Sequence, residues 1–193
     1  MKTMTASTDA LLQEILDGQG PFGYARKAGS YESAMTTSAV AGLVVRPTTV
    51  AHVTIWNGEA TGGKSLVIDR MFSFQLVSAA AASVYTMWYC SHLEGMTKPT
   101  NDITALRGTA NGGEPDNSKV IVDAGATVLD NGWFPCGGDG DVEATGVLPG
   151  GGTEWECHGR IVVPPKGGLS IAISASSVDE DFTCGAAWWR VQL

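Results

Sequence analysis

From residue 36 to the end of the chain, apolar and polar residues alternate with a period of two in a series of short segments. This period predicts β-strands, because successive side chains of a strand point to opposite faces. The expected strands cover residues 36–45, 51–56, 66–77, 83–91, 119–123, 153–163, 169–174 and 182–193. Turn signals such as Asn57-Gly58 and Pro164-Pro165 separate them. The pattern predicts an all-β fold, an antiparallel, jelly-roll-like β-sandwich of about eight strands.

Three segments carry more detailed patterns. In residues 66–77 the apolar positions share one parity, as on a single face of a strand: Leu66, Ile68, Phe72, Phe74 and Leu76. Residues 169–174 show the clearest alternation of the chain, in which Leu169, Ile171 and Ile173 alternate with Ser170, Ala172 and Ser174. The glycine-rich stretch from Asp130 to Gly152 is expected to be mostly loop.

Residues 8–17 are the one good helix candidate. Thr8 or Asp9 can cap the N-terminus, an apolar stripe follows, and Gly18 ends the helix. The stripe consists of Leu11, Leu12, Ile15 and Leu16. A helix of about ten residues is not stable alone in water, so we expect it to dock on its own domain or on a neighbouring chain. The predicted organisation is an N-terminal helix and arm, residues 1–35, followed by a sandwich domain, residues 36–193.

Tryptophans in strands that are apolar on both faces predict an oligomer interface. Trp188 and Trp189 are adjacent, so they must face opposite sides of one strand. One can enter the core, and the other is covered either by the same chain or by a second subunit. We favour a subunit, because aromatic residues are enriched at interface cores. The expected interface residues are Trp88, Trp188, Trp189, Leu11, Leu12 and Ile15.

The net charge of −8 narrows the range of partners. An acidic chain with scattered Lys and Arg residues repels phosphate backbones, so no nucleic-acid partner is expected. The chain has no run of about 18 apolar residues and no apolar signal core near Met1, so neither a membrane span nor secretion is expected. The cysteines form no CxxC pair and are expected to be reduced thiols, most of them buried. They are Cys90, Cys136, Cys157 and Cys184.

Residues 58–65, from Gly58 to Ser65 and including Lys64, match the phosphate-binding pattern GxxxxGK[ST]. The chemistry of that loop needs a helix N-terminus directed at the phosphates. Here the following residues alternate like a strand, and the chain lacks the βαβ order that carries such loops. We therefore interpret the segment as a hairpin loop, and no cofactor is expected.

An acidic run places three carboxylates at alternate positions, a spacing that could suit a hard cation such as calcium. They belong to Asp139, Asp141 and Glu143. No EF-hand pattern surrounds them, so we favour a solvated acidic loop, and no metal is expected.

The three histidines, His52, His92 and His158, are far apart in the sequence. No GxSxG or HExxH motif accompanies them. Spacing alone does not decide whether they belong to a triad, because triad partners meet only in space. We favour surface or hydrogen-bonded histidines, and no catalytic residue is predicted.

Two stretches resemble the trimeric jelly-roll structural proteins of tailed-phage virions. Residues 54–58 (TIWNG) with 63–71 (GKSLVIDRM) resemble their first hairpin, and residues 162–171 (VVPPKGGLSI) resemble their proline-glycine turn before a late strand. The short aromatic final strand also fits, and the similarity spans residues 36–193. Cupins share the proline-glycine turn, but the HxH metal ligands of cupins are missing. The resemblance implies a capsid decoration (cement) protein that acts as a homotrimer in the virion and contacts the major capsid protein.

The sequence therefore supports three hypotheses of function. The first is a non-enzymatic virion structural protein that stabilises the phage head by self-association and by contacts to capsid subunits. The second is a carbohydrate- or receptor-binding fibre or tail module that uses the loop aromatics Trp133 and Phe134. The third is an enzyme on a cupin-like sandwich.

Overall fold

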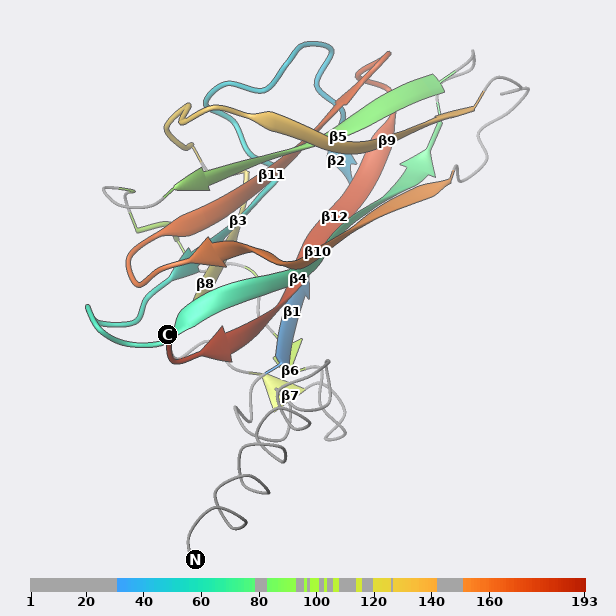
Figure 1. Ribbon diagram of the computed structural model, residues 1–193. Coiled ribbons are helices and arrows are strands. Elements are labelled where there is room, and N and C mark those ends of the chain that lie inside the picture. Colours follow the sequence, from blue (N-terminus) through green and yellow to red (C-terminus); the bar gives the residue numbers. More distant parts are fainter. Residues whose placement is uncertain are drawn as a thin grey trace, which may run out of the picture.

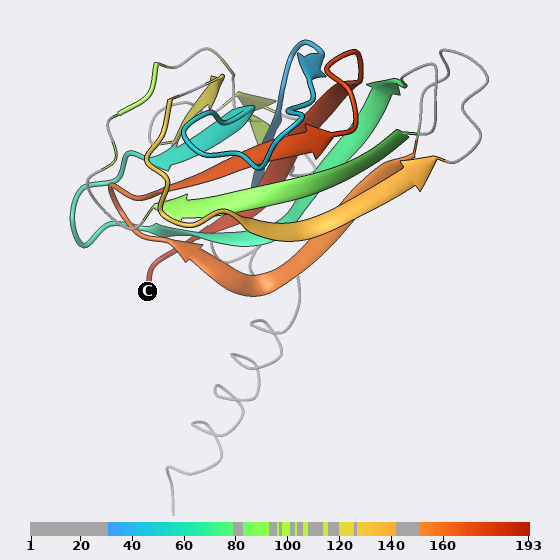
Figure 2. The same ribbon diagram turned by 90° about the horizontal axis from the view of Figure 1, so that it is seen from above.

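Two antiparallel β-sheets lie face to face in the computed structural model (Figure 1), and the view from above shows them as two layers (Figure 2). The structure describes residues 31–78, 83–92, 96, 98–100, 103, 106–107, 114–115, 120–125, 127–141 and 151–193. No helix occurs among these residues. The predicted all-β, sandwich-like fold is confirmed.

Sheet A has seven strands and sheet B has five. Sheet A contains β1 (Tyr31–Met35), β2 (Val40–Ala41), β4 (Ser65–Val77), β6 (Leu106–Arg107), β7 (Glu114–Pro115), β10 (Gly152–Val163) and β12 (Asp181–Val191), in the order β10-β4-β12-β1-β6-β7 with β2 also on β12. Sheet B contains β3 (Val53–Asn57), β5 (Ser83–His92), β8 (Val120–Ala124), β9 (Phe134–Asp141) and β11 (Gly168–Ala175), in the order β8-β3-β11-β5-β9. Every predicted strand except the first overlaps an observed strand of similar extent.

The core lies between the two sheets and is built by alternate residues of each strand. Its largest fully buried apolar side chains are Ile55, Leu66, Ile68, Met71, Met87, Leu169, Ile171, Ile173, Phe182 and Trp188. Tyr85 of sheet B and Phe182 of sheet A meet across it with ring centroids 4.9 Å apart. Burial of these side chains is the main favourable contribution to folding.

The parity predicted for residues 66–77 is wrong beyond Ile68. In the register of β4 with β12, Ile68 pairs with Trp188 and Arg70 with Ala187, so Asp69 is the extra residue of a β-bulge. A bulge of one residue reverses the faces of everything after it. The residues that face inward are Met71, Ser73 and Gln75, and those that face outward are Phe72, Phe74 and Leu76. The inward amide of Gln75 donates a 2.8 Å hydrogen bond to the buried Glu180 carboxylate.

Apart from the two-residue strands β6 and β7, two strands lie where none was predicted. β1 falls inside the expected arm and belongs to sheet A, and the predicted strand at 36–45 is reduced to β2. β9 runs through the glycine-rich stretch that was expected to be loop. Glycine is needed there because a Cβ on Gly138 would lie 2.6 Å from the Tyr85 carbonyl oxygen on β5. Close approach of two strands, rather than a turn, accounts for this glycine.

Some predictions fall outside the described residues. These are the helix at 8–17 with Leu11, Leu12 and Ile15, and the third carboxylate of the acidic run, Glu143. Asp139 and Asp141 lie in β9 rather than in a loop. Among the described residues there is no helix long and apolar enough to cross a membrane.

Candidate functional site

The outer face of sheet B is covered by the chain itself. Residues 43–52 and 127–133 lie over β5 and β11 and form a second, smaller apolar cluster with them. The cluster contains Leu43, Ala51, Trp88, Cys90, Met96, Val128, Trp133 and Ala172. The indole N–H of Trp133 donates to the Thr48 carbonyl at 2.7 Å, which fastens one covering segment to the other. The part of this face around Trp88 and Ala172 is therefore covered within one chain, whereas Val84 at the start of β5 stays 60% exposed.

A chain of hydrogen bonds runs through this covered face. Thr54 Oγ1 lies 3.0 Å from Ser170 Oγ, and Ser170 Oγ lies 2.9 Å from His92 Nε2. The other ring nitrogen, His92 Nδ1, lies 3.0 Å from the amide nitrogen of Asn131. A Ser–His–Asn arrangement is thus assembled from residues that are widely separated in the sequence.

The hydrogen bonds of this arrangement run in the opposite direction to those of a catalytic triad. The Asn131 amide nitrogen can only donate, so His92 Nδ1 accepts and the ring proton lies on Nε2. Nε2 then donates to Ser170 Oγ, whereas a general base would accept the serine proton there. Ser170 is also 0% exposed, and burial lowers the pKa of His92. The arrangement satisfies buried polar groups beneath the covering segments.

The second buried histidine, His52, holds the first covering segment to the sheet. Its Nδ1 accepts a 3.1 Å hydrogen bond from the backbone N–H of Ile173, and its own backbone N–H donates to the Ile171 carbonyl at 2.9 Å. Burial lowers the pKa of His52 to about 4, against a smaller opposing effect of a hydrogen bond with the Ala41 backbone. His52 is therefore neutral at physiological pH and acts as a structural residue. His158 is exposed and lies 3.2 Å from the Glu156 carboxylate.

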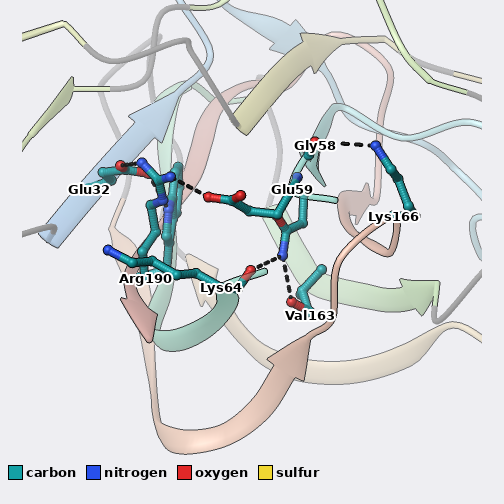
Figure 3. A network of polar contacts seen from close by, with 9 residues as sticks. Glu32, Gly58, Glu59, Lys64, Val163, Lys166 and Arg190 are labelled. Atoms are coloured by element: carbon teal, nitrogen blue, oxygen red, sulfur yellow. Dashed lines mark hydrogen bonds and ion pairs between the residues drawn. The ribbon is translucent and has the colours of Figure 1, made fainter. Parts of the chain in front are cut away.

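A buried ion-pair network lies at one end of the sandwich (Figure 3). The Arg190 guanidinium contacts Glu32 at 3.2 Å and Glu59 at 2.6 Å, and the Trp188 indole N–H donates to Glu32 at 2.8 Å. Burial opposes the charge on Arg190, but the two carboxylates raise its pKa overall. Glu32 comes from β1, Arg190 from β12 and Glu59 from the loop after β3, so the network joins three segments distant in sequence.

The same network shows what the phosphate-pattern loop does. Lys166 Nζ donates to the Gly58 carbonyl at 3.2 Å, and the Asn57 side chain donates to the Lys64 and Val163 carbonyls at 2.9 and 3.1 Å (Figure 3). The segment that follows is strand β4 rather than a helix. The residues form a loop as expected, but the hairpin interpretation is wrong, because β3 belongs to sheet B and β4 to sheet A.

Trp188 and Trp189 are both buried within the chain. Trp188 enters the core, and Trp189 on the opposite side is 7% exposed with its ring 4.2 Å from that of Tyr31 on β1. The expectation that the second tryptophan is left for a neighbouring subunit is wrong, because the unpredicted strand β1 covers it. Trp88 is likewise held inside its own chain, with its indole N–H donating to Ser174 Oγ at 2.8 Å.

The outer face of sheet A is different, because it presents apolar side chains to solvent. Phe74 and Met35 are each 46% exposed and Leu76 is 41% exposed. Met35 pairs with Gly185, which pairs with Phe72, so Met35 and Phe72 flank a position without a side chain. We call these four residues, Met35, Phe72, Phe74 and Leu76, the apolar strip. The alternation predicted for residues 66–77 placed three of them, Phe72, Phe74 and Leu76, on the core side of the strand.

The cysteines show no sign of reactivity or metal binding. All four are free thiols, and burial raises the pKa of Cys136, Cys157 and Cys184 to about 12. A protonated thiol is a weak nucleophile. Among the described residues no group of three or more His, Cys, Asp or Glu is arranged to hold a metal ion.

Of the two aromatic residues proposed for carbohydrate binding, one is buried and the other is exposed. Trp133 is buried under sheet B's covering segments, so it is not available to a ligand. Phe134 is 60% exposed, and its ring lies 5.9 Å from that of Tyr89.

No family model matches the chain, and no curated protein or solved structure matches it either. Function is therefore inferred from the residues and the geometry described above.

Proposed function

We propose that the protein is a non-catalytic structural protein that associates with further copies of itself through the apolar strip on sheet A. The observation that carries the proposal is the exposure of Phe74, Leu76 and Met35 on one continuous sheet face. Part of the outer face of the opposite sheet is instead covered by segments of the same chain. Clustered exposed apolar side chains mark interaction sites on soluble domains.

The proposal includes a jelly-roll fold, which the strand pairing supports. Taken in chain order without the two-residue β2, β6 and β7 and without the edge strand β8 of sheet B, the eight remaining strands pair first with last, second with seventh, third with sixth and fourth with fifth. These pairs are β1 with β12, β3 with β11, β4 with β10, and β5 with β9. Jelly rolls of eight strands are common in viral capsid proteins and in lectins.

The biological setting we propose is a virion, in which the protein decorates the capsid as a homotrimer and contacts the major capsid protein. Support comes from the jelly-roll pairing and from the resemblance of residues 54–71 and 162–171 to phage structural proteins. The apolar stripe Leu11, Leu12 and Ile15 would add contacts from the N-terminal arm. Fold alone does not specify function, so the interface needs a direct test.

The test compares the sedimentation mass of the wild-type chain with that of the double variant Phe74→Ser/Leu76→Ser. The proposal predicts that the wild type sediments as an oligomer, a trimer if the virion setting is right, and that the variant is shifted to a monomer. A matched control is Val44→Ser/Val45→Ser, since these valines are 58% and 67% exposed away from the strip; it should remain oligomeric. A wild type that stays monomeric at every workable concentration would overturn the proposal.

A further inference from the structure

A row of three aromatic rings crosses the open edge of the sandwich, where β9 ends sheet B and β10 ends sheet A. The ring centroids of Phe134 and Tyr89 are 5.9 Å apart, and those of Tyr89 and Trp155 are 5.3 Å apart. Phe134 comes from β9, Tyr89 from β5 and Trp155 from β10, so the row extends from one sheet to the other. We call these three residues the aromatic row.

The two thiols beside the aromatic row are uncharged at physiological pH. The Cys136 thiol donates to the Met87 carbonyl at 3.4 Å, and burial raises the pKa of Cys136 and Cys157 to about 12. Burial and the two nearby cysteines also raise the pKa of Tyr89, so its hydroxyl stays neutral.

The carboxylates beside Trp155 in sequence point away from the row. Glu154 and Glu156 occupy the alternate positions of β10, so their side chains lie on the other face of that strand. Each has a partner there: Arg70 lies 2.7 Å from Glu154, and His158 lies 3.2 Å from Glu156. A neutral ligand therefore suits the aromatic row better than a charged one.

Two polar groups at the row are available to a ligand. Within the part of the chain that the structure describes, neither the Tyr89 hydroxyl nor the Trp155 indole N–H has a hydrogen-bond partner. Neither is among the buried polar atoms that lack a partner, so both reach solvent. Most buried tyrosine and tryptophan polar groups do find a partner, and Trp88, Trp133 and Trp188 all do so here.

We propose that the aromatic row binds a neutral oligosaccharide. The C–H face of a sugar ring packs on an aromatic ring, and the sugar hydroxyls can accept hydrogen bonds from Tyr89 and Trp155. Nucleobases would stack equally well, but the phosphates that accompany them are repelled by a chain of net charge −8. The site does not depend on self-association, because the apolar strip lies on the outer face of sheet A.

The test begins with an array of neutral and acidic glycans, followed by calorimetric titration of the neutral glycan that binds best. Phe134→Ala should weaken binding at least tenfold, and Tyr89→Phe, which removes only the hydroxyl, should weaken it less. Phe134 is exposed, so its loss should leave the thermal midpoint almost unchanged. Phe74→Ala is the matched control, an exposed phenylalanine on the other sheet, and should bind like the wild type.

The proposal is overturned if no neutral glycan binds saturably, if acidic glycans are preferred, or if Phe134→Ala binds as tightly as the wild type. Self-association is measured separately by sedimentation. A failure of glycan binding with intact oligomers, or the reverse, therefore identifies which of the two proposals is wrong.

Discussion

The two outer faces of the sandwich are built in opposite ways. On sheet B several outward side chains of β3 and β11 are polar, such as Thr54, Ser170 and Ser174, yet they are buried or half-buried under residues 43–52 and 127–133. On sheet A the outward side chains of β4 are large and apolar, yet Phe74 and Leu76 are exposed. On sheet B these polar side chains are covered together with the apolar Trp88, whereas on sheet A the apolar Phe74 and Leu76 are open.

The difference teaches how covered and uncovered faces can be recognised. A covered polar face needs hydrogen-bond partners, and Ser170 has them in Thr54 and His92. Unpaired polar groups would cost about 1–3 kcal/mol each when buried. An open apolar face has no such requirement inside the monomer, and we propose that the apolar strip makes a contact outside it. The predictions below test the two faces in turn.

The largest effect is expected from Trp133→Ala on the covered face of sheet B. Loss of this buried ring leaves a cavity and frees the Thr48 carbonyl, so the free energy of unfolding should fall by about 3–5 kcal/mol. Phe74→Ala on the open face is the comparison and should cost the monomer far less. Urea denaturation at low protein concentration measures both. Equal losses for the two variants would mean that the faces are not different.

The next effect is a loss of stability in acid, from His52. The folded pKa of about 4 lies below the unfolded value of about 6.5. The unfolded state therefore binds the proton more readily, so the stabilisation is complete above pH 6.5 and is lost as the pH falls towards 4. The loss should reach about 3 kcal/mol, since each pKa unit corresponds to about 1.4 kcal/mol. His92, whose pKa is also lowered, acts in the same direction.

The control for this effect is His52→Gln, followed by chemical denaturation across the same pH range. The variant should be less stable at pH 7 but should lose clearly less stability between pH 6.5 and 4. An unchanged pH dependence would show that His52 is not the group responsible.

A smaller effect is expected from Ser170→Ala, which removes the centre of the hydrogen-bond chain. Thr54 Oγ1 and His92 Nε2 would both lose a partner in a buried site, at a cost of about 1–3 kcal/mol. Thr86→Ala is a suitable comparison, because Thr86 is a half-buried β5 residue on the same face of sheet B. A Ser170→Ala variant as stable as the wild type would show that these hydrogen bonds contribute nothing to the free energy of unfolding.

The smallest effect on the monomer is expected from the double variant Phe74→Ser/Leu76→Ser. Exposed positions away from caps and networks change stability by about 0.5 kcal/mol or less. The thermal midpoint measured at low concentration should therefore stay close to that of the wild type. A large drop would mean that the apolar strip is part of the monomer's own packing.

Much of the fold was predictable from alternation, and the exceptions have specific physical causes. Seven strands follow from their periodicity, but Asp69 reverses the parity of β4 because a bulge leaves no mark in a binary pattern. The glycines of β9 resembled loop residues, although Gly138 is there for close strand contact. Trp189 appeared to need a second subunit because β1, which covers it, was not predicted.

The candidate sites were less predictable because they combine residues distant in sequence. Of the aromatic row, only Phe134 was proposed from the sequence as a binding residue. Tyr89 and Trp155 come from other strands and lie beside it only once the two sheets are packed together. The apolar strip depends on the bulge and on the unpredicted β1, which supplies Met35.

Side-chain oxidation footprinting at low and high protein concentration tests the role of the apolar strip most directly. Self-association through this face predicts that Met35, Phe74 and Leu76 become protected from hydroxyl radicals as concentration rises. Phe134, which is more exposed and belongs to sheet B, should stay equally reactive without added glycan. Unchanged reactivity of the strip in a sample that sedimentation shows to be oligomeric would contradict the account, because the copies would then meet elsewhere.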